Sequence, residues 1–205
     1  MQHFSKNPKV ENIFHRFVNV PFEPEINVSE LPDYDPEVYY YKKFSTCNNP
    51  DLYRSDLCRW FAELGIAVPE YNIFYTPPFG GRLPIHIDQV HVKLNWSYGA
   101  PGSKQIWWEP KDEKYVLEIK SEYEDLRGLK LEHASKLFEV EITKPSLVHV
   151  SMFHSTYNPS EEERWTISIP LFHPVSPTQW YPNGLKALTW NEAIDLFEEY
   201  IDEEQ

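Results

Sequence analysis

Apolar residues recur at helical spacing in two segments of the chain. Over residues 51–64 they fall at steps of three and four, which predicts an amphipathic helix with one face on a core. A second helix is predicted over 189–201, where Thr189 and Glu192 match the pattern of a capping box. Residues 1–48 are rich in proline and show no sustained period, so we expect an arm that wraps the core.

The segment 70–172 has the pattern of a β structure. Short runs such as "HVKLNW", "LFEVEI" and "RWTISIPLF" are rich in β-branched and aromatic residues, and turn sequences such as "PPFGG" and "GAPG" separate several of them. Many short strands at this spacing are typical of a sandwich or a barrel-like jelly roll. For 205 residues we expect one domain that is mainly β with flanking helices.

Composition narrows the range of partners. The formal net charge is −13, whereas a surface that binds nucleic acid needs an excess of lysine and arginine, so a nucleic-acid partner is disfavoured. No apolar run approaches the roughly 20 residues of a membrane helix, and the first residues lack the pattern of a signal peptide. Cys47 and Cys58 show neither metal-binding nor disulfide spacing. These features predict a cytoplasmic protein and leave its oligomeric state open.

The stretch "RLPIHIDQV" places His86 and Asp88 two positions apart. On an extended strand, residues at i and i+2 point to the same side, so that an imidazole and a carboxylate can bind one metal ion. The H-x-D pattern is short and also arises by chance. Alone it more often marks an ordinary strand than a metal site, and the rest of the chain has to decide.

A second informative stretch runs from 145 to 171. Its histidines His149 and His154 lie five positions apart, so on one regular strand they face opposite ways and at most one faces a given pocket. After a turn-like "NPSEEE", Arg164 begins an alternation in which Thr166 lies on the same face. This polar face fits a strand that faces water, and it also fits the lining of a cavity that holds an anion.

These pieces combine into a more specific pattern. His86, Asp88 and His154 are two histidines and one carboxylate, the ligand set of non-haem Fe(II) oxygenases. Arg164 follows His154 by ten positions, on what we expect to be the next strand of a hairpin. Its planar guanidinium suits a carboxylate. We therefore predict that His154, and not His149, binds the metal.

The region 70–172 resembles the Fe(II)- and 2-oxoglutarate-dependent dioxygenases, and among them the small phage and marine-bacterial members related to prolyl hydroxylases. The resemblance is carried by "PIHID", "LVHVSMFHSTYNPS" and "RWTISI". It implies a double-stranded β-helix of the cupin-like kind, with iron held by the histidines and the aspartate named above. It also implies that Arg164 pairs with the far carboxylate of 2-oxoglutarate and that Thr166 fills the hydroxyl position beside it. Tyr75 is similar to a tyrosine that binds the cosubstrate in some members.

The activity that this resemblance implies is hydroxylation of a small-molecule or peptidyl substrate with Fe(II), 2-oxoglutarate and O2, and release of succinate and CO2. Two other functions fit the residues: a cupin-like metal enzyme that uses no 2-oxoglutarate, and a non-catalytic β-roll that binds a ligand or partner. Alternation directs either Trp107 or Trp108 toward the cavity as a wall for substrate, and two strand aromatics packed in a core fit the sequence at least as well. We assign no role to Asn95. His3, His15 and His133 are expected at the surface, and His91 and His173 either beside the site or in structural roles.

Overall fold

The computed structural model describes residues 12–21, 41–45, 56–68, 70–120, 125–174 and 185–202. Most of the predicted arm, Cys47, and the start of the first predicted helix lie outside these residues. No helix among them is long and apolar enough to span a membrane.

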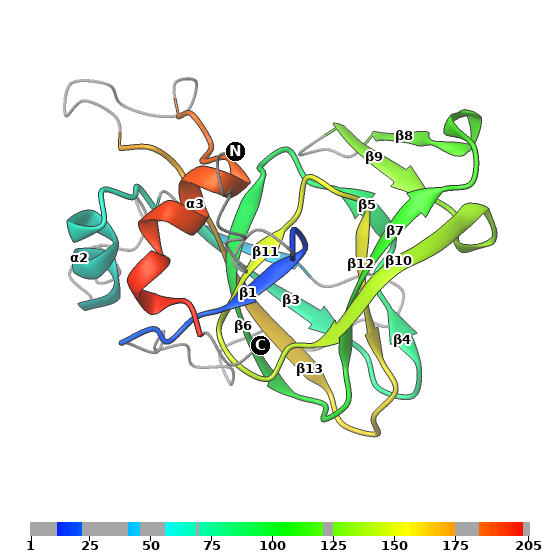
Figure 1. Ribbon diagram of the computed structural model, residues 1–205. Helices are drawn as coiled ribbons and strands as arrows, with labels where there is room; N and C mark the ends of the chain where they lie inside the picture. The colour runs from blue at the N-terminus through cyan, green and yellow to red at the C-terminus, as the bar shows by residue number, and fades with distance from the viewer. Residues whose placement is uncertain are drawn as a thin grey trace, which may run out of the picture.

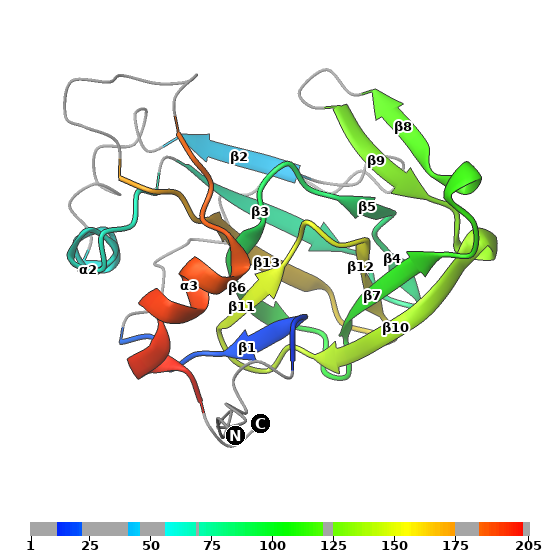
Figure 2. The same ribbon diagram turned by 45° about the horizontal axis from the view of Figure 1, so that its top comes forward.

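The described strands form two antiparallel sheets that face each other (Figures 1 and 2). The first has the order β1-β11-β6-β13-β3-β2, and the second has the order β10-β7-β12-β5-β9-β8, with β4 paired to β12. The strands of the first sheet are β1 (His15–Phe17), β2 (Tyr41–Ser45), β3 (Glu70–Thr76), β6 (Val92–Gly99), β11 (Ser146–His149) and β13 (Arg164–Pro170). Those of the second are β4 (Gly81–Arg82), β5 (Ile85–Ile87), β7 (Lys104–Pro110), β8 (Leu117–Lys120), β9 (Asp125–Leu129), β10 (Ala134–Glu141) and β12 (His154–Asn158).

The path of the chain through eight of these strands is that of a jelly roll. In chain order they are β3, β5, β6, β7, β10, β11, β12 and β13. Numbered one to eight, they give one sheet in the order 6-3-8-1 and the other in the order 5-4-7-2. The chain thus winds between the two sheets as a double-stranded β-helix. This confirms the predicted fold class, with the other strands added around that frame.

Two helices cover the outer face of the first sheet (Figure 2). Helix α2 (Asp56–Glu63) buries Leu57, Trp60 and Phe61, and helix α3 (Trp190–Leu196) buries Trp190 and Ala193. They share one apolar core with the alternate side chains of β6 and β13, which are Val92, Leu94, Trp96, Ile167 and Ile169. The other face of these two strands is thereby turned toward the space between the sheets.

The described ends of both helices agree with their local sequence. Gly65 follows α2 with a φ of 69°, a conformation that glycine adopts without strain. At the start of α3, the Thr189 hydroxyl accepts from the Glu192 amide and the Glu192 carboxylate accepts from the Thr189 amide, which confirms the predicted capping box. The last predicted turn is a short 3-10 helix, Glu198–Tyr200.

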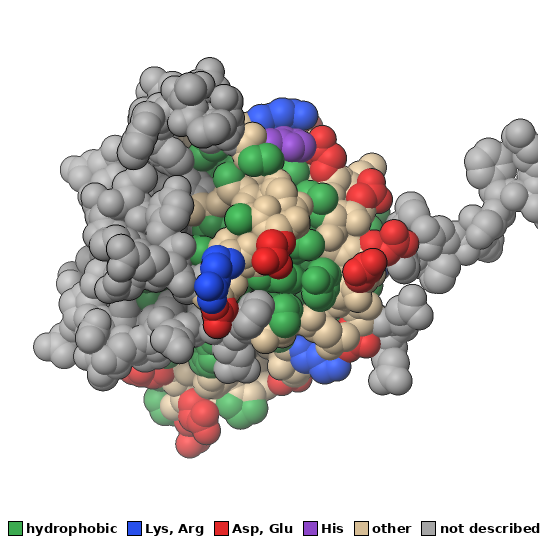
Figure 3. Space-filling model, turned by 90° about the vertical axis from the view of Figure 1, so that its left-hand side faces the viewer, with side chains coloured by type: hydrophobic (Ala, Val, Ile, Leu, Met, Phe, Trp, Pro, Cys, Tyr) green, Lys and Arg blue, Asp and Glu red, His purple; other side chains and the backbone are tan. Residues whose placement is uncertain are grey.

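Two described parts of the N-terminal arm lie at opposite edges of the first sheet. Strand β1 pairs with β11, and strand β2 pairs with β3. The space-filling view of the side that carries α2 and α3 (Figure 3) shows acidic and basic side chains scattered among neutral and apolar ones. On the described part of that face no basic surface gathers, which agrees with the acidic composition.

Candidate metal centre

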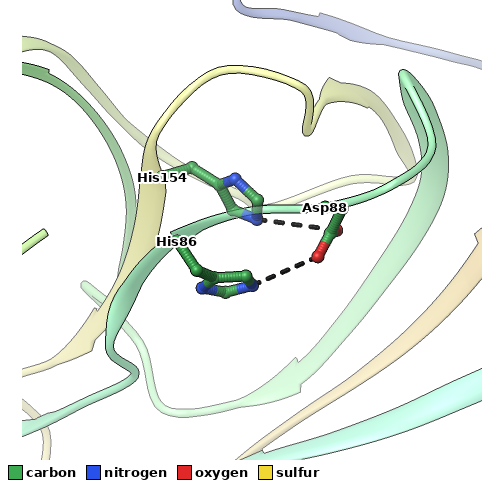
Figure 4. A group of neighbouring side chains, drawn as sticks. All are labelled: His86, Asp88 and His154. Carbon is green, nitrogen blue, oxygen red and sulfur yellow. Dashed lines mark ion pairs between the residues drawn. The ribbon is translucent and has the colours of Figure 1, made fainter. Parts of the chain in front are cut away.

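Three side chains from two strands of the second sheet converge between the sheets (Figure 4). His86 in β5 and His154 in β12 are direct partners in the strand register, and Asp88 follows β5 by one residue. The Nε2 atom of His86 lies 3.3 Å from Oδ1 of Asp88, and the Nε2 atom of His154 lies 3.8 Å from Oδ2. The three side chains each offer an atom within 4.8 Å of the others, close enough to hold one metal ion.

The backbone fixes how both imidazoles point. The Nδ1 atom of His86 donates to the carbonyl of Pro84 at 2.8 Å, and the Nδ1 atom of His154 donates to the carbonyl of Met152 at 2.9 Å. Because each Nδ1 carries the proton, each Nε2 presents a lone pair toward the centre. Such outer hydrogen bonds orient the histidine ligands of metal sites and set their tautomer.

Electrostatics keep Asp88 ionised and His154 neutral, the states that a metal needs, and make His86 more basic than an ordinary histidine. Burial opposes ionisation of Asp88, but Lys93 and His86 together hold the pKa of that carboxyl well below its usual range. Burial and the neighbouring His86 lower the pKa of His154 to about 3, so this ring is neutral at physiological pH. Burial is the largest single effect on His86 and lowers its pKa, but the hydrogen bond and charge of Asp88 together with the Pro84 carbonyl outweigh it, and the net shift is upward.

Lys93 is a site residue that sequence reasoning missed. Its Nζ atom lies 2.6 Å from Oδ2 of Asp88, and both side chains are about nine-tenths buried. The signal was present in "HVKLNW": Lys93 shares a face of β6 with Asn95, opposite the apolar Val92 and Leu94. A lysine on a strand more often faces water, and only the helices on the other face of the sheet turn this one inward.

A polar pocket extends from the three residues into the space between the sheets. It is partly open to solvent, and the empty space within it and at its mouth amounts to about 370 Å³. Arg164 and Thr166 lie in its wall, so the polar face of β13 lines a cavity and does not face water. The pocket is lined by Phe74, Leu83, Asp88, Lys93, Asn95, Gln105, Val150, His154, Thr156, Arg164, Thr166 and Ser168.

Arg164 is buried in this pocket without an acidic partner among the described residues. It is 2% exposed. Its Nη2 atom donates to the Ser97 hydroxyl at 2.8 Å, and its Nε atom has no hydrogen-bond partner. Burial lowers the pKa of Arg164 to about 10, so the group remains a cation at neutral pH. A buried cation with unused donors has the chemistry to bind an anion.

The two histidines of the second informative stretch do not share a strand. His149 ends β11 in the first sheet, and the chain turns before His154 begins β12 in the second. The premise that the two histidines lie on one regular strand, and therefore face opposite ways, was wrong. The ring of His149 still lies away from the centre, because its Nδ1 donates to the carbonyl of Ile13 at 2.9 Å and its Nε2 accepts from the Ser151 hydroxyl.

The expected hairpin is also wrong. Strands β12 and β13 are consecutive in the chain but belong to different sheets. Arg164 therefore enters the pocket from the first sheet, whereas His154 enters it from the second.

Tyr75 and Trp107 lie outside the pocket lining. Tyr75 pairs with Trp165 across β3 and β13, on the face opposite Arg164, and its hydroxyl donates to Glu163 at 3.1 Å. Tyr75 therefore lies apart from Arg164 and Thr166, with which the resemblance grouped it as a residue that binds the cosubstrate. Trp107 points inward but is fully buried in an apolar cluster with Val148 and Val150, and Trp108 packs on the outer side of the second sheet.

The remaining described histidines have structural surroundings. His15 was expected at the surface and is instead 4% exposed, because β1 presses it against Phe138 and Trp107. His133 is half-buried and stacks on Tyr115, and His173 lies 3.3 Å from Glu192 at the capping box. His91 is exposed. His3 lies outside the described residues.

Comparison with known proteins gives weak likenesses. No protein-family profile matches the chain, and no curated protein matches it. Among solved structures, oxalate oxidase matches with 12% identity and a TM-score of 0.34, over 76% of this chain and 72% of that one. E. coli ycfD matches with 15% identity and a TM-score of 0.38, over 91% of this chain and 54% of that one. We therefore assign the jelly roll from its strand order alone.

Proposed function

We propose that this chain is an Fe(II)- and 2-oxoglutarate-dependent oxygenase that hydroxylates a small-molecule or peptidyl substrate. The observation that carries the proposal is the buried guanidinium of Arg164, which has no acidic partner among the described residues and shares one pocket with Asp88 and His154. A cupin-like metal enzyme that uses no 2-oxo acid has no need of such a cation.

The donor atoms fit Fe(II). Two imidazoles oriented through Nδ1 and one ionised carboxylate form the three-residue set that leaves coordination positions free for ligands that exchange. His86, Asp88 and His154 would hold the ion. With 2-oxoglutarate and O2, bound iron supplies the oxidation of a C–H bond to an alcohol, coupled to release of succinate and CO2.

The residues of the chain bind and orient the cosubstrate in this proposal. Arg164 receives the far carboxylate through its unused donors, and Ser97 fixes the guanidinium from behind at 2.8 Å. The Thr166 hydroxyl lies 3.4 Å from that of Ser97 and adds a donor to the same end of the pocket. Arg164 is 2% exposed, and low exposure to water strengthens each charged hydrogen bond at this end.

The test measures succinate formed from 2-oxoglutarate by the full chain with Fe(II), ascorbate and O2, first without and then with a panel of metabolites and peptides. Slow turnover without a second substrate is expected. Arg164→Leu should abolish it and still bind Mn(II). The matched control is Arg127→Leu, which removes a guanidinium that is 55% exposed and paired with Glu113, and which should leave turnover unchanged.

The other outcomes separate the alternative functions. Wild type that binds the metal but neither binds nor turns over 2-oxoglutarate would be a jelly-roll metal enzyme of another class. Wild type that binds no metal would be a non-catalytic binding module, and the proposal would be wrong.

A further inference from the structure

Lys93 is the second cation in the pocket, and its position differs from that of Arg164. Its ammonium contacts an oxygen of Asp88, one of the three candidate metal ligands, at 2.6 Å. The same nitrogen lies over the ring of Phe74, 5.4 Å from its centroid. Lys93 therefore stands at the metal end of the pocket, on the side of the first sheet.

The ammonium group has donors to spare. A lysine side chain carries three N–H donors, and among the described residues Asp88 is the acceptor that the structure gives to Lys93. The side chain is 9% exposed and lines the pocket, so the pocket is the space open to its other donors. Buried donors of this kind require an acceptor, and the pocket is where one can bind.

Lys93 also constrains how Asp88 can act as a ligand. Oδ2 of Asp88 is held by the ammonium, whereas Oδ1 lies toward His86 at 3.3 Å. An oxygen that a lysine holds is a poor second donor to the same metal, so Asp88 binds through one oxygen. The positive charge of Lys93 repels a divalent cation and attracts the anion that binds beside it.

We propose that Lys93 is a positioning and specificity-determining residue, which holds Asp88 to one-oxygen ligation and receives the metal-bound end of a 2-oxo acid, while Arg164 receives the far carboxylate. This inference rests on the proposed function. It divides the pocket into two anion subsites of different effect. The near subsite, at Lys93, contributes to the binding of every 2-oxo acid. The far subsite, at Arg164, contributes only to the binding of acids with a second carboxylate.

The first arm of the test measures Mn(II) affinity calorimetrically at pH 8, where Asp88 is ionised. Lys93→Gln keeps a hydrogen-bond donor and removes the charge, so the metal should bind roughly tenfold more tightly because a repelling cation is gone. A residue with only a structural role would weaken the metal site when replaced. The matched control is Lys144→Met, which breaks a surface ion pair of the same 2.6 Å length with Asp202 and should change nothing.

The second arm measures binding of 2-oxoglutarate and of 2-oxopentanoate, which has the same carbon chain without the far carboxylate, to the Mn(II)-loaded proteins. Lys93→Gln should weaken both acids by the same factor, roughly tenfold. Arg164→Leu should weaken 2-oxoglutarate alone. Lys93→Arg keeps the charge and should restore most of the affinity for both acids.

The results separate the two proposals. If wild type binds Mn(II) but neither acid, the proposed function fails while the first arm still tests the effect of Lys93 on the metal. If wild type binds both acids and Lys93→Gln binds the metal no more tightly, or loses only 2-oxoglutarate, the inference about Lys93 fails alone. Lys93→Met, of similar volume, repeats the test where Lys93→Gln does not fold. If neither variant folds, the charge is structural and the inference is wrong.

Discussion

His86 and His154 are direct partners across β5 and β12, with ring centroids 4.5 Å apart. Two candidate metal ligands are thus placed by the register of one strand pair and not by a flexible loop. A one-residue slip of β12 would carry its histidine to the other face of the sheet. The metal-binding geometry therefore depends on residues that hold this register.

Replacing His154 with alanine should remove the metal, and replacing His149 should not. We expect Mn(II) affinity to fall by more than about a hundredfold in His154→Ala, beyond the 10–100-fold that loss of an outer hydrogen-bond partner costs. His149 bonds to Ile13 and Ser151 and contributes nothing to the centre. Metal content after dialysis measures both. Loss of metal in His149→Ala alone would contradict the arrangement described.

Arg164→Lys should weaken 2-oxoglutarate binding by roughly ten- to a hundredfold, because the charge is kept and the two-pronged geometry is lost. Metal affinity should be unchanged, since Arg164 is not a ligand. Calorimetric titration of the Mn(II)-loaded variant gives both values. An affinity equal to that of wild type would remove Arg164 from the cosubstrate site.

Tyr75→Phe should leave 2-oxoglutarate binding unchanged. The hydroxyl of Tyr75 bonds to Glu163 on the outer side of β13, and its ring packs against Trp165, 4.6 Å between centroids. We expect a loss of about 1 kcal/mol in the free energy of unfolding, the usual worth of one hydrogen bond. Urea denaturation measures the stability. A marked loss of cosubstrate affinity would restore the role that resemblance gave to this residue.

The stability of the protein should fall between pH 6.5 and about 4 because of His15. Burial, with a smaller effect of Arg16, lowers the pKa of His15 to about 4, whereas in the unfolded chain it is 6.5. The unfolded chain therefore takes up a proton in this range that the folded protein does not, and acid favours unfolding. The loss is about 3 kcal/mol when complete.

The variant His15→Phe tests this cause. Phenylalanine can stack on Phe138 and Trp107 as the imidazole does, and it does not titrate. The free energy of unfolding, measured at several pH values, should fall less steeply in the variant than in wild type. Equal slopes would assign the acid sensitivity to other groups.

Local patterns predicted the elements well, because strand and helix periods are written in neighbouring residues. The alternation from Arg164 onward and the pair His86 and Asp88 needed no long-range information. Assigning each strand to a sheet does need long-range information, and the turn between His149 and His154 was missed for that reason. Nothing within β12 and β13 tells whether they form a hairpin or cross between sheets.

The orientation of the polar strand faces was equally undetermined by local sequence. Lys93 and Arg164 face inward because α2 and α3 cover the opposite, apolar face of their sheet. That covering brings together residues far apart in the chain, such as Phe61 and Phe197. A single strand therefore cannot reveal whether its polar side meets water or a cavity.

The two edge strands that the N-terminal arm provides have a consequence for assembly and for solubility. Most of the chain separates His15 from its partner Val148, so β1 can join the sheet only after β11 exists. Contacts of such long sequence separation slow folding. Until they form, β11 and β3 present unpaired backbone at both margins of the sheet, the surface through which β proteins self-associate. A chain shortened from its N-terminus would thus be prone to aggregate even with its pocket intact.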